Sequence, residues 1–394
     1  MHVGLFTDSY RPRTSGVVTA VETSARQLRS RGHRVSIVAP AYPGYADVDP
    51  DVVRVPSVTP PGHPDFPLAL PYPGRALRAV RALGLDLVHT HSPFLLGGMG
   101  WWAARALGRP VLFTYHTRYD EYAHYAPVVG ELARPLVSAY ATVYCNQCDC
   151  VLAPLPSIAA LLRDAGVRVR VVVVPSAGID VSAFAPQPGF AGDERTAVRG
   201  RFGVPPRSPL LVFVGRLARE KNVALLLAAL AALPSEVRLL LVGDGPERAA
   251  LEAQAKDAAL TSRAVFAGTQ PPAVVAQVLA AADLFVFPST TETFGIAMIE
   301  AMAAGCAVVA VRAPASSDLV RDGETGRLVP ADPGAFAEAV RDLLAQPARR
   351  GAMGGAARAA AADYDQARVT DRLLIVYQEL LARQRVAGGG LTCV

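Results

Sequence analysis

The sequence of 394 residues has little lysine, few cysteines and no long apolar run. Only Lys221 and Lys256 are lysines among its 39 basic residues, so arginine carries most of the formal net charge of +5. No uncharged apolar run reaches the ~20 residues that span a bilayer, and residues 1–10 are typical of a charged strand rather than a signal peptide. We therefore expect a cytoplasmic protein of about two domains with anionic partners.

Cysteine is present only five times, and this odd number indicates free thiols in a reducing compartment. Three cysteines form the cluster C-N-Q-C-D-C at 145–150. Neighbouring thiolates can share a metal ion, but no fourth ligand follows at zinc-finger spacing. Cysteine is often a small buried hydrophobic residue, so no metal site is predicted here.

Short β-branched apolar runs alternate with helical stretches in two successive series. This pattern is typical of parallel strands covered by helices, and it predicts an α/β fold with two doubly wound domains. The expected domains are 1–180 and 210–362, with a Pro- and Gly-rich linker at 181–209 between them. A helix with a flexible tail at 363–394 is expected to pack back toward the first domain. Ligands of such sheets bind at the carboxyl ends of the strands, so we expect the site in the cleft between the domains.

The expected strands can be placed by residue number. They are 3–7, 34–39, 52–56, 85–90, 110–115, 150–153 and 170–174 in the first domain, and 210–215, 239–243, 265–268, 284–288, 307–311 and 328–330 in the second.

Two common nucleotide-binding signatures are missing. No G-x-G-x-x-G follows the first strand and no G-x-x-x-x-G-K-[ST] occurs, which argues against a nicotinamide dehydrogenase and a P-loop NTPase. Instead, Gly16 precedes a helix after the first strand, where backbone amides can approach an anion. An ordinary turn glycine would explain Gly16 equally well.

The second domain opens with the more specific pattern G-R-L-A-R-E-K-N at 215–222. Arg216 and Lys221 bracket a turn at the carboxyl end of a strand, and together a guanidinium and an ammonium can neutralise a pyrophosphate leaving group. A solvated charged turn is the alternative. The next strand ends in V-G-D-G-P, where Gly243 permits close approach of a ligand.

Glu292 and Glu300, eight residues apart, form the strongest pattern. Glu292 lies in a polar turn after a strand and can accept hydrogen bonds from sugar hydroxyls. A helix is expected to begin near Phe294 and Gly295, and its first amides, including that of Ile296, would form an anion site. Glu300 follows just over two helical turns later among apolar neighbours. A buried carboxylate there needs polar partners, such as the hydroxyls of a ribose.

These motifs together resemble the retaining, GT-B-fold glycosyltransferases of family 4. The E-x7-E pattern at 292–300, the segment at 215–222 and S-G-V at 15–17 carry the resemblance, which extends over essentially the whole chain. It implies two Rossmann-like domains facing a central cleft. The implied reaction is metal-independent transfer of a sugar from UDP-glucose or UDP-galactose with retention of configuration, and no cofactor is implied. The lysine of the first glycine loop in glycogen synthases is absent, which argues against a glucan synthase.

The resemblance also implies residue roles. Glu292 and His116, which matches the active-site histidine of the family, would hold the donor sugar and position the acceptor. The nucleotide phosphate would act as base for the incoming hydroxyl, so no side-chain nucleophile is required. The implied nucleotide-sugar-binding residues are Gly16, Arg216, Lys221, Gly243, Phe294, Gly295, Ile296 and Glu300.

A second pair of histidines ends another strand, in V-H-T-H-S at 88–92. His91 is expected to line the acceptor side. We expect His89 and His91 on opposite faces of the strand and therefore predict no shared metal ion.

The acceptor is predicted from the first domain. The segment T-Y-H-T-R-Y-D-E-Y-A-H-Y at 114–125 resembles bacterial enzymes that glycosylate diacylglycerol, and its tyrosines suit a lipid interface. A basic stripe on the expected helix 73–83 and a tryptophan pair are predicted to dock this domain on anionic lipid at the inner face of the cell membrane. An ordinary amphipathic surface helix is the alternative. The residues concerned are Tyr119, Tyr122, Arg75, Arg78, Arg81, Trp101 and Trp102.

The expected function is therefore transfer of glucose or galactose from a UDP-sugar to 1,2-diacylglycerol in glycolipid synthesis. Phosphatidylinositol or a soluble small molecule is the alternative acceptor. An inactive sugar-nucleotide-binding scaffold is the alternative from another class. Nucleic-acid binding is not expected, because the sequence has no basic groove motif or aromatic–basic recognition element.

Overall fold

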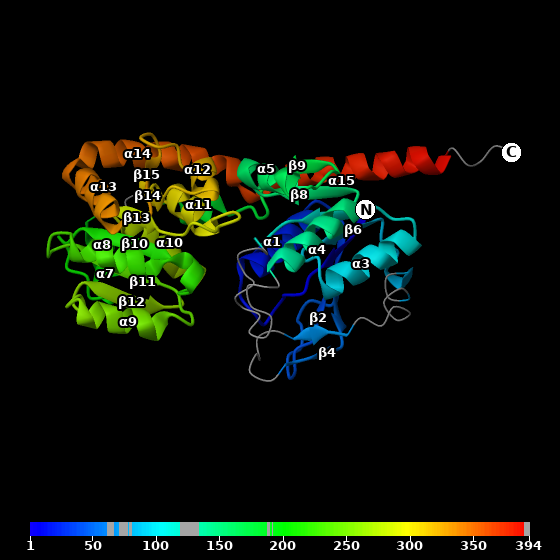
Figure 1. Cartoon of the computed structure of the whole chain (residues 1–394), viewed down its shortest axis with the longest axis horizontal. Coiled ribbons are helices and arrows are strands. Elements are labelled where there is room, and N and C mark those ends of the chain that lie inside the picture. The colour runs from blue at the N-terminus through cyan, green and yellow to red at the C-terminus, as the bar shows by residue number, and fades with distance from the viewer. Residues whose placement is uncertain are drawn as a thin grey trace. The chain divides into compact units, whose positions relative to one another are not determined.

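The computed structural model describes residues 1–60, 67–70, 78, 81–118, 134–186, 190 and 192–389. The chain forms two compact units, which we call unit 1 (Met1–Gly178 with Gln366–Val394) and unit 2 (Ile179–Asp365). Each unit contains a parallel sheet with helices packed on it (Figure 1). In the described part of the chain, no helix is both long enough and apolar enough to cross a membrane.

Unit 1 contains a seven-stranded parallel sheet in the order β3-β2-β1-β6-β7-β8-β9. Its strands are β1 (His2–Phe6), β2 (Arg34–Pro40), β3 (Val52–Val55), β6 (Leu87–Thr90), β7 (Val111–Thr114), β8 (Cys150–Ala153) and β9 (Val171–Val173). The helices are α1 (Gly16–Ser30), α3 (Leu95–Ala106), α4 (Arg134–Gln147), α5 (Pro156–Asp164) and α15 (Gln366–Gly389). The short antiparallel pair β4 (Ser57–Val58) and β5 (Leu68–Ala69) was not predicted.

Unit 2 contains a six-stranded parallel sheet in the order β12-β11-β10-β13-β14-β15. Its strands are β10 (Leu210–Val214), β11 (Arg238–Val242), β12 (Ala264–Gly268), β13 (Leu284–Phe287), β14 (Val308–Val311) and β15 (Gly326–Val329). The helices are α6 (Val181–Phe184), α7 (Asp193–Arg201), η3 (Arg219–Lys221), α8 (Val223–Ala231), α9 (Arg248–Asp257), α10 (Pro272–Ala281), α11 (Ile296–Ala303), α12 (Pro314–Leu319), α13 (Pro333–Ala345), α14 (Pro347–Ala361) and η4 (Ala362–Tyr364).

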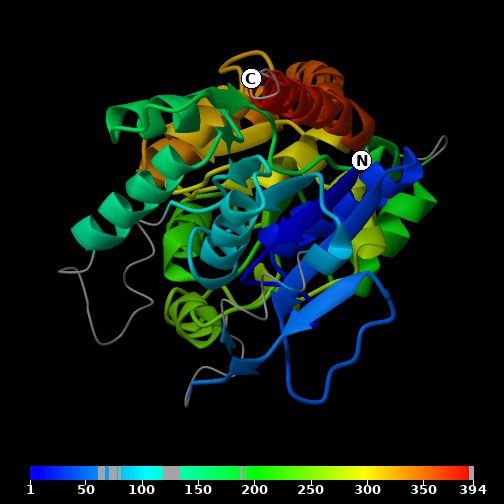
Figure 2. The same cartoon turned by 90° about the vertical axis from the view of Figure 1, so that its right-hand side faces the viewer.

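The C-terminal helix α15, red in Figures 1 and 2, is part of unit 1 and packs against α1. Val369, Leu373, Val376 and Leu380 recur at helical spacing and join the buried core of the sheet. Tyr377 lies on the same face and is completely buried. Unit 1 is therefore built from both ends of the chain.

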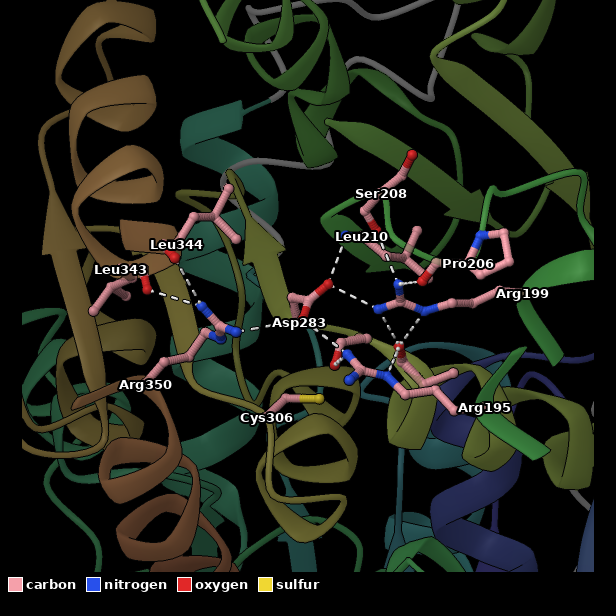
Figure 3. A network of polar contacts seen from close by, with 12 residues as sticks. Arg195, Arg199, Pro206, Ser208, Leu210, Asp283, Cys306, Leu343, Leu344 and Arg350 are labelled. Carbon is pink, nitrogen blue, oxygen red and sulfur yellow. Dashed lines mark hydrogen bonds and ion pairs between the residues drawn. The ribbon is translucent and has the colours of Figure 1, made fainter. Parts of the chain in front are cut away.

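The segment 181–209, expected as a linker, belongs to unit 2 and contains α6 and α7. A polar network at the start of β13 holds it there (Figure 3). The Asp283 carboxylate accepts hydrogen bonds from Arg195, Arg199 and the Leu210 amide, each at 2.8 Å. Arg350 of α14 lies 3.5 Å from the same carboxylate. Burial alone would raise the pKa of Asp283, but the Leu210 amide and these arginines lower it instead. The proline and glycine content of 181–209 gave no sign of this anchoring.

Candidate active site

In unit 2, the turns after β10 and β13 lie together at the carboxyl ends of neighbouring strands. The Ser289 hydroxyl donates to the Glu220 carbonyl at 3.0 Å, and the Thr291 hydroxyl reaches the same oxygen at 3.4 Å. These bonds bring Lys221 Nζ into an ion pair with Glu292 Oε1. Two residues that the sequence assigned to a pyrophosphate and a sugar are therefore direct partners.

The Lys221–Glu292 pair is largely shielded from solvent, with side-chain exposures of 18% and 14%. Shielding strengthens the attraction between the charges and holds both groups in place. The pair puts a cation and a hydrogen-bond acceptor side by side, which suits the junction of a phosphate and a sugar. Arg216 lies in the same turn and is exposed.

The N-terminus of α11 adds a third element to this site. Gly295 adopts φ +75° at the N-cap, a conformation that favours glycine, and an added Cβ would lie 2.6 Å from Met298 Cε. Met298 N is the first amide of the helix to bond back to the Gly295 carbonyl, at 2.9 Å. The amide of Ile296 precedes it at the positive end of the helix dipole. Phe294 contributes its backbone here, because its side chain is buried against Tyr364.

Glu300 lies in α11 without a hydrogen-bond or ion-pair partner among the described residues. Its neighbours Ile299 and Ala301 are completely buried. Burial raises the pKa of the Glu300 carboxyl to about 7. The residue is half-buried, and a partly shielded acceptor without a protein partner is suited to the hydroxyls of a ligand.

The structure gives a further reason why residue 243 is glycine. Its φ is +133°, and an added Cβ would lie 2.0 Å from the Gly215 carbonyl oxygen. The Gly215 amide in turn donates to the Val242 carbonyl at 2.9 Å. Gly243 therefore allows the turns after β10 and β11 to touch, and its contact with a nucleotide stays a prediction.

In unit 1, Gly16 is the exposed first residue of α1. The Ser15 side chain caps this helix by accepting from the Val18 amide at 3.3 Å. The amide of Gly16 is the first of the helix and lies three positions before Thr19, whose amide donates to the Ser15 carbonyl at 3.0 Å, so it is one of the end amides that a helix N-terminal anion site uses.

Three histidines of unit 1, His89, His91 and His116, form one cluster, and the expectation that His89 and His91 face opposite sides was wrong. Their ring centroids are 4.2 Å apart, because residues i and i+2 of a strand share a face. His91 Nδ1 lies 2.8 Å from His116 Nε2, with ring centroids 5.0 Å apart. His91 is 2% exposed, and its Nε2 is buried without a hydrogen-bond partner. Within the described residues, no group of three His, Cys, Asp or Glu is arranged to hold a metal ion.

Burial lowers the pKa of all three rings, to about 3 for His89 and His116. They are therefore neutral at physiological pH and act as hydrogen-bond partners rather than as cations. The buried contacts of His89 with Tyr377 and Thr114 were not predicted from the sequence. Its neighbour in the cluster, Tyr377, is 288 residues away and has no local sequence signal.

Asp8, two residues after the end of β1, was not predicted as a functional residue. The Asp8 carboxylate accepts from the Ser92 hydroxyl and from the Leu96 amide, the latter at 2.8 Å. Burial raises the pKa of this carboxyl. Asp8 thereby ties the start of α3 to the end of β1, beside the histidine cluster. An acidic residue right after the first strand was the available signal.

The predicted acceptor residues are only partly described. Arg78 and Arg81 are exposed, whereas Arg75, Tyr119 and Tyr122 lie outside the described residues. Trp102 is 40% exposed. Trp101 is half-buried, and its Nε1 donates to the Gln147 carbonyl at 2.9 Å, which fixes it to the end of α4.

The four cysteines within the described residues are Cys145, Cys148, Cys150 and Cys306, and all are buried free thiols. Burial raises the pKa of Cys145 to about 12 and that of Cys150 to about 11. Such thiols are protonated and unreactive at neutral pH.

Both parallel-sheet units are matched by models of one class of enzyme. The family model described as Glycosyltransferase Family 4 matches residues 14–182, and the model described as Glycosyl transferases group 1 matches residues 194–360. The chain belongs to this glycosyltransferase family and has the GT-B fold, as the sequence analysis predicted.

Two relatives and one solved structure illustrate the likeness. The chain is 33% identical over 340 residues to the alpha-monoglucosyldiacylglycerol synthase of Streptococcus pneumoniae, covering 83% of this chain and 75% of that protein. It is 34% identical over 393 residues to the GDP-mannose-dependent alpha-mannosyltransferase of Mycolicibacterium smegmatis, covering 98% and 99%. The fold matches sucrose-phosphate synthase from Thermosynechococcus elongatus with a TM-score of 0.79 at 24% identity, covering 97% and 99%.

Proposed function

We propose that this glycosyltransferase moves glucose or galactose from a UDP-sugar to 1,2-diacylglycerol, with retention of configuration and without a metal ion. The observation that carries the donor half of the proposal is the Lys221–Glu292 pair beside the start of α11. It joins a cation, a carboxylate and helix amides at one sheet edge, which is what a sugar diphosphate needs.

The donor groups act by charge and hydrogen bonding. Lys221 and Arg216, with the amides at the start of α11, neutralise the charge that develops on the leaving diphosphate. Glu292 holds the sugar hydroxyls, and Glu300 accepts hydrogen bonds from the ribose. In this proposal the two cations and the N-terminus of α11 neutralise the diphosphate, as a divalent metal ion does in other enzymes.

His116 acts as a neutral group in this proposal. Its low pKa, about 3, means that it can accept or donate one hydrogen bond but does not carry a proton as imidazolium at neutral pH. We therefore assign His116 the orientation of the donor sugar and acceptor. The departing phosphate oxygen takes the proton of the attacking hydroxyl, so the same face of the sugar is substituted.

An exposed apolar surface on α3 and α4 supports a lipid acceptor. We call it the lipid face: Phe94, Leu95, Trp102, Leu136, Tyr140 and Val143, between 37% and 70% exposed. The Phe94 and Tyr140 rings stack at 5.8 Å, and the Tyr140 hydroxyl donates to the Pro93 carbonyl at 3.0 Å. These contacts join the two helices into one surface, which begins three residues after His91.

The charges near the lipid face suit an anionic membrane. Residues 94–109 and 134–147 contain no aspartate or glutamate and three arginines, Arg105, Arg109 and Arg134, of which Arg105 is paired with Asp149 at 3.1 Å. Large apolar side chains with basic neighbours combine insertion with attraction to anionic headgroups. Contiguous exposed apolar surface of this kind is uncommon on a protein without such a partner.

The donor site is tested by UDP release. Purified protein is incubated with UDP-glucose or UDP-galactose, with and without dispersed diacylglycerol, and the linkage of the glycolipid is determined. We expect diacylglycerol to stimulate UDP release and Glu292→Ala to abolish transfer with little change in the circular dichroism spectrum. The matched control is Glu324→Ala, an exposed carboxylate paired with Arg321 in the same unit, which should retain transfer. Near-normal transfer by Glu292→Ala would remove Glu292 from the site, and no turnover with any donor would favour the inactive scaffold.

A second donor is favoured by one observation. The mannosyltransferase relative, which is named for GDP-mannose, matches nearly the full length of both chains. GDP-mannose therefore belongs in the same panel, with phosphatidylinositol as a second lipid. Turnover with GDP-mannose alone would replace the UDP-hexose in this proposal and leave the roles of Lys221 and Glu292 intact.

The lipid face is tested by vesicle co-sedimentation. We expect binding to rise with the phosphatidylglycerol content of phosphatidylcholine vesicles and to fall with salt. The double variant Leu136→Ser and Val143→Ser should lower the bound fraction about tenfold. Ile375→Ser is the control, because Ile375 is 55% exposed, as Val143 is, and lies on α15 outside the lipid face. Equal losses in both variants, or indifference to lipid charge, would refute docking through this face.

A further inference from the structure

A buried polar cluster in unit 1 joins the C-terminal helix to the strand ends beside His116. The Tyr377 hydroxyl of α15 lies 2.6 Å from His89 Nδ1, and His89 Nε2 lies 2.7 Å from Thr114 Oγ1. All three side chains are at most 2% exposed. Both nitrogens of the His89 ring are therefore occupied, in a place that water does not reach.

The protons of this cluster can be assigned from chemistry. His89 is neutral and has one N–H. A phenol is the stronger acid of the two hydroxyls, so we assign Tyr377 as donor to Nδ1 and His89 Nε2–H as donor to Thr114 Oγ1. The Tyr377 hydroxyl thus selects one tautomer and one orientation of the His89 ring.

His89 contacts the proposed active site in two ways. Its ring lies against His91 at 4.2 Å between centroids, and His91 Nδ1 reaches His116 Nε2 at 2.8 Å. Its bond to Thr114 holds the last residue of β7, two positions before His116. A change in the orientation of His89 would therefore reach His116 both through the ring contacts and through the backbone.

We propose that Tyr377 is a positioning residue for His116, acting through His89 and His91. The inference rests on the proposed role of His116 in orienting donor and acceptor. It gives the C-terminal helix a part in the active site in addition to its part in the core. Small displacements of a positioning group are costly for transfer, because they lower the fraction of bound substrate in reactive geometry.

The test is Tyr377→Phe in the full chain, which removes one oxygen and keeps the ring. Two measurements are made: the imidazole 15N resonances of histidine-labelled protein, and kcat and KM for both substrates. Thr370→Val is the matched control, because its buried hydroxyl lies on the same helix and donates to the Gln366 carbonyl at 2.7 Å.

In Tyr377→Phe we expect the 15N resonances of His89 and His116 to shift and kcat to fall about tenfold, with both KM values within twofold of wild type. Thr370→Val should leave the 15N resonances and kcat unchanged, whatever its effect on Tm. If Tyr377→Phe lowers Tm but leaves the His116 resonances and kcat unchanged, Tyr377 is a core residue only and the inference fails. If the wild type transfers no sugar, the proposed function fails, while the resonances of His116 still decide whether Tyr377 positions it.

Discussion

Glu292 and Glu300 are eight residues apart, yet their carboxyl groups have different surroundings. Glu292 is paired with Lys221, whereas Glu300 faces apolar neighbours and has a pKa of about 7. A raised pKa means that ionisation of Glu300 near neutral pH disfavours the folded state. Such strain at a site is expected where the missing partner is a ligand.

Replacement of Glu300 by glutamine tests both the effect of this carboxyl on stability and its effect on donor binding. The folded-state pKa of Glu300 is raised above its usual value of 4.5, so ionisation destabilises the fold progressively as pH rises from 4.5 to about 7. Glu300→Gln should therefore raise Tm above wild type at pH 8, with a smaller gain at pH 5. Donor KM at pH 8 should rise about tenfold, because a neutral amide accepts hydrogen bonds from hydroxyls less strongly than a carboxylate. Thermal melts and kinetics at both pH values measure this, and an unchanged donor KM would remove Glu300 from the donor site.

At the scale of elements, most strands and helices were predictable from the sequence. Cys150–Ala153 matches its prediction, and other strand ends, such as Leu210–Val214, differ by a residue or two. Continuous β-branched runs signal buried parallel strands because both faces are covered. The hairpin of β4 and β5 was missed because two-residue strands have no periodicity. The anchoring of α7 to unit 2 was not predicted, because Asp283 is 84 residues from Arg199.

The anchor of α7 makes a testable contribution to the stability of unit 2. Asp283→Asn leaves Arg199, which is 4% exposed, without its counter-charge. We expect a loss of about 3 kcal/mol in the free energy of unfolding, measured with urea at pH 7. Because the folded pKa of Asp283 is lowered, its contribution is present at neutral pH and is lost only as pH falls below its usual 3.8. Asp193→Asn, an exposed carboxylate of the same helix, should stay within about 0.5 kcal/mol of wild type. A comparable loss in both variants would contradict the anchoring role.

At the scale of the whole molecule, the residues of the proposed donor site could be nominated from the sequence, whereas the contacts within the histidine cluster could not. Local motifs sufficed to nominate Lys221 and Glu292, and the structure shows that their turns follow neighbouring strands. The contact between them depends on a shared carbonyl, that of Glu220, which no motif encodes. The contact between Tyr377 and His89 depends on where α15 returns to unit 1, and chain separation hides such pairs from any sequence pattern.

The neutral histidine cluster also makes a prediction for the stability of the whole chain in acid. Burial lowers the pKa of His89, His91 and His116 below the usual 6.5, so the unfolded chain binds more protons than the folded chain once pH falls below 6.5. Stability is therefore complete above pH 6.5 and declines toward about pH 3, by about 1.4 kcal/mol per pH unit for each such ring. His89→Gln should reduce this slope between pH 6 and 4.5 by about one proton in urea titrations. Thr370→Val should change stability equally at every pH, because it changes no proton count. An unchanged slope in His89→Gln would mean that His89 is protonated in the folded state, and the assigned bond from Tyr377 to Nδ1 would then be excluded.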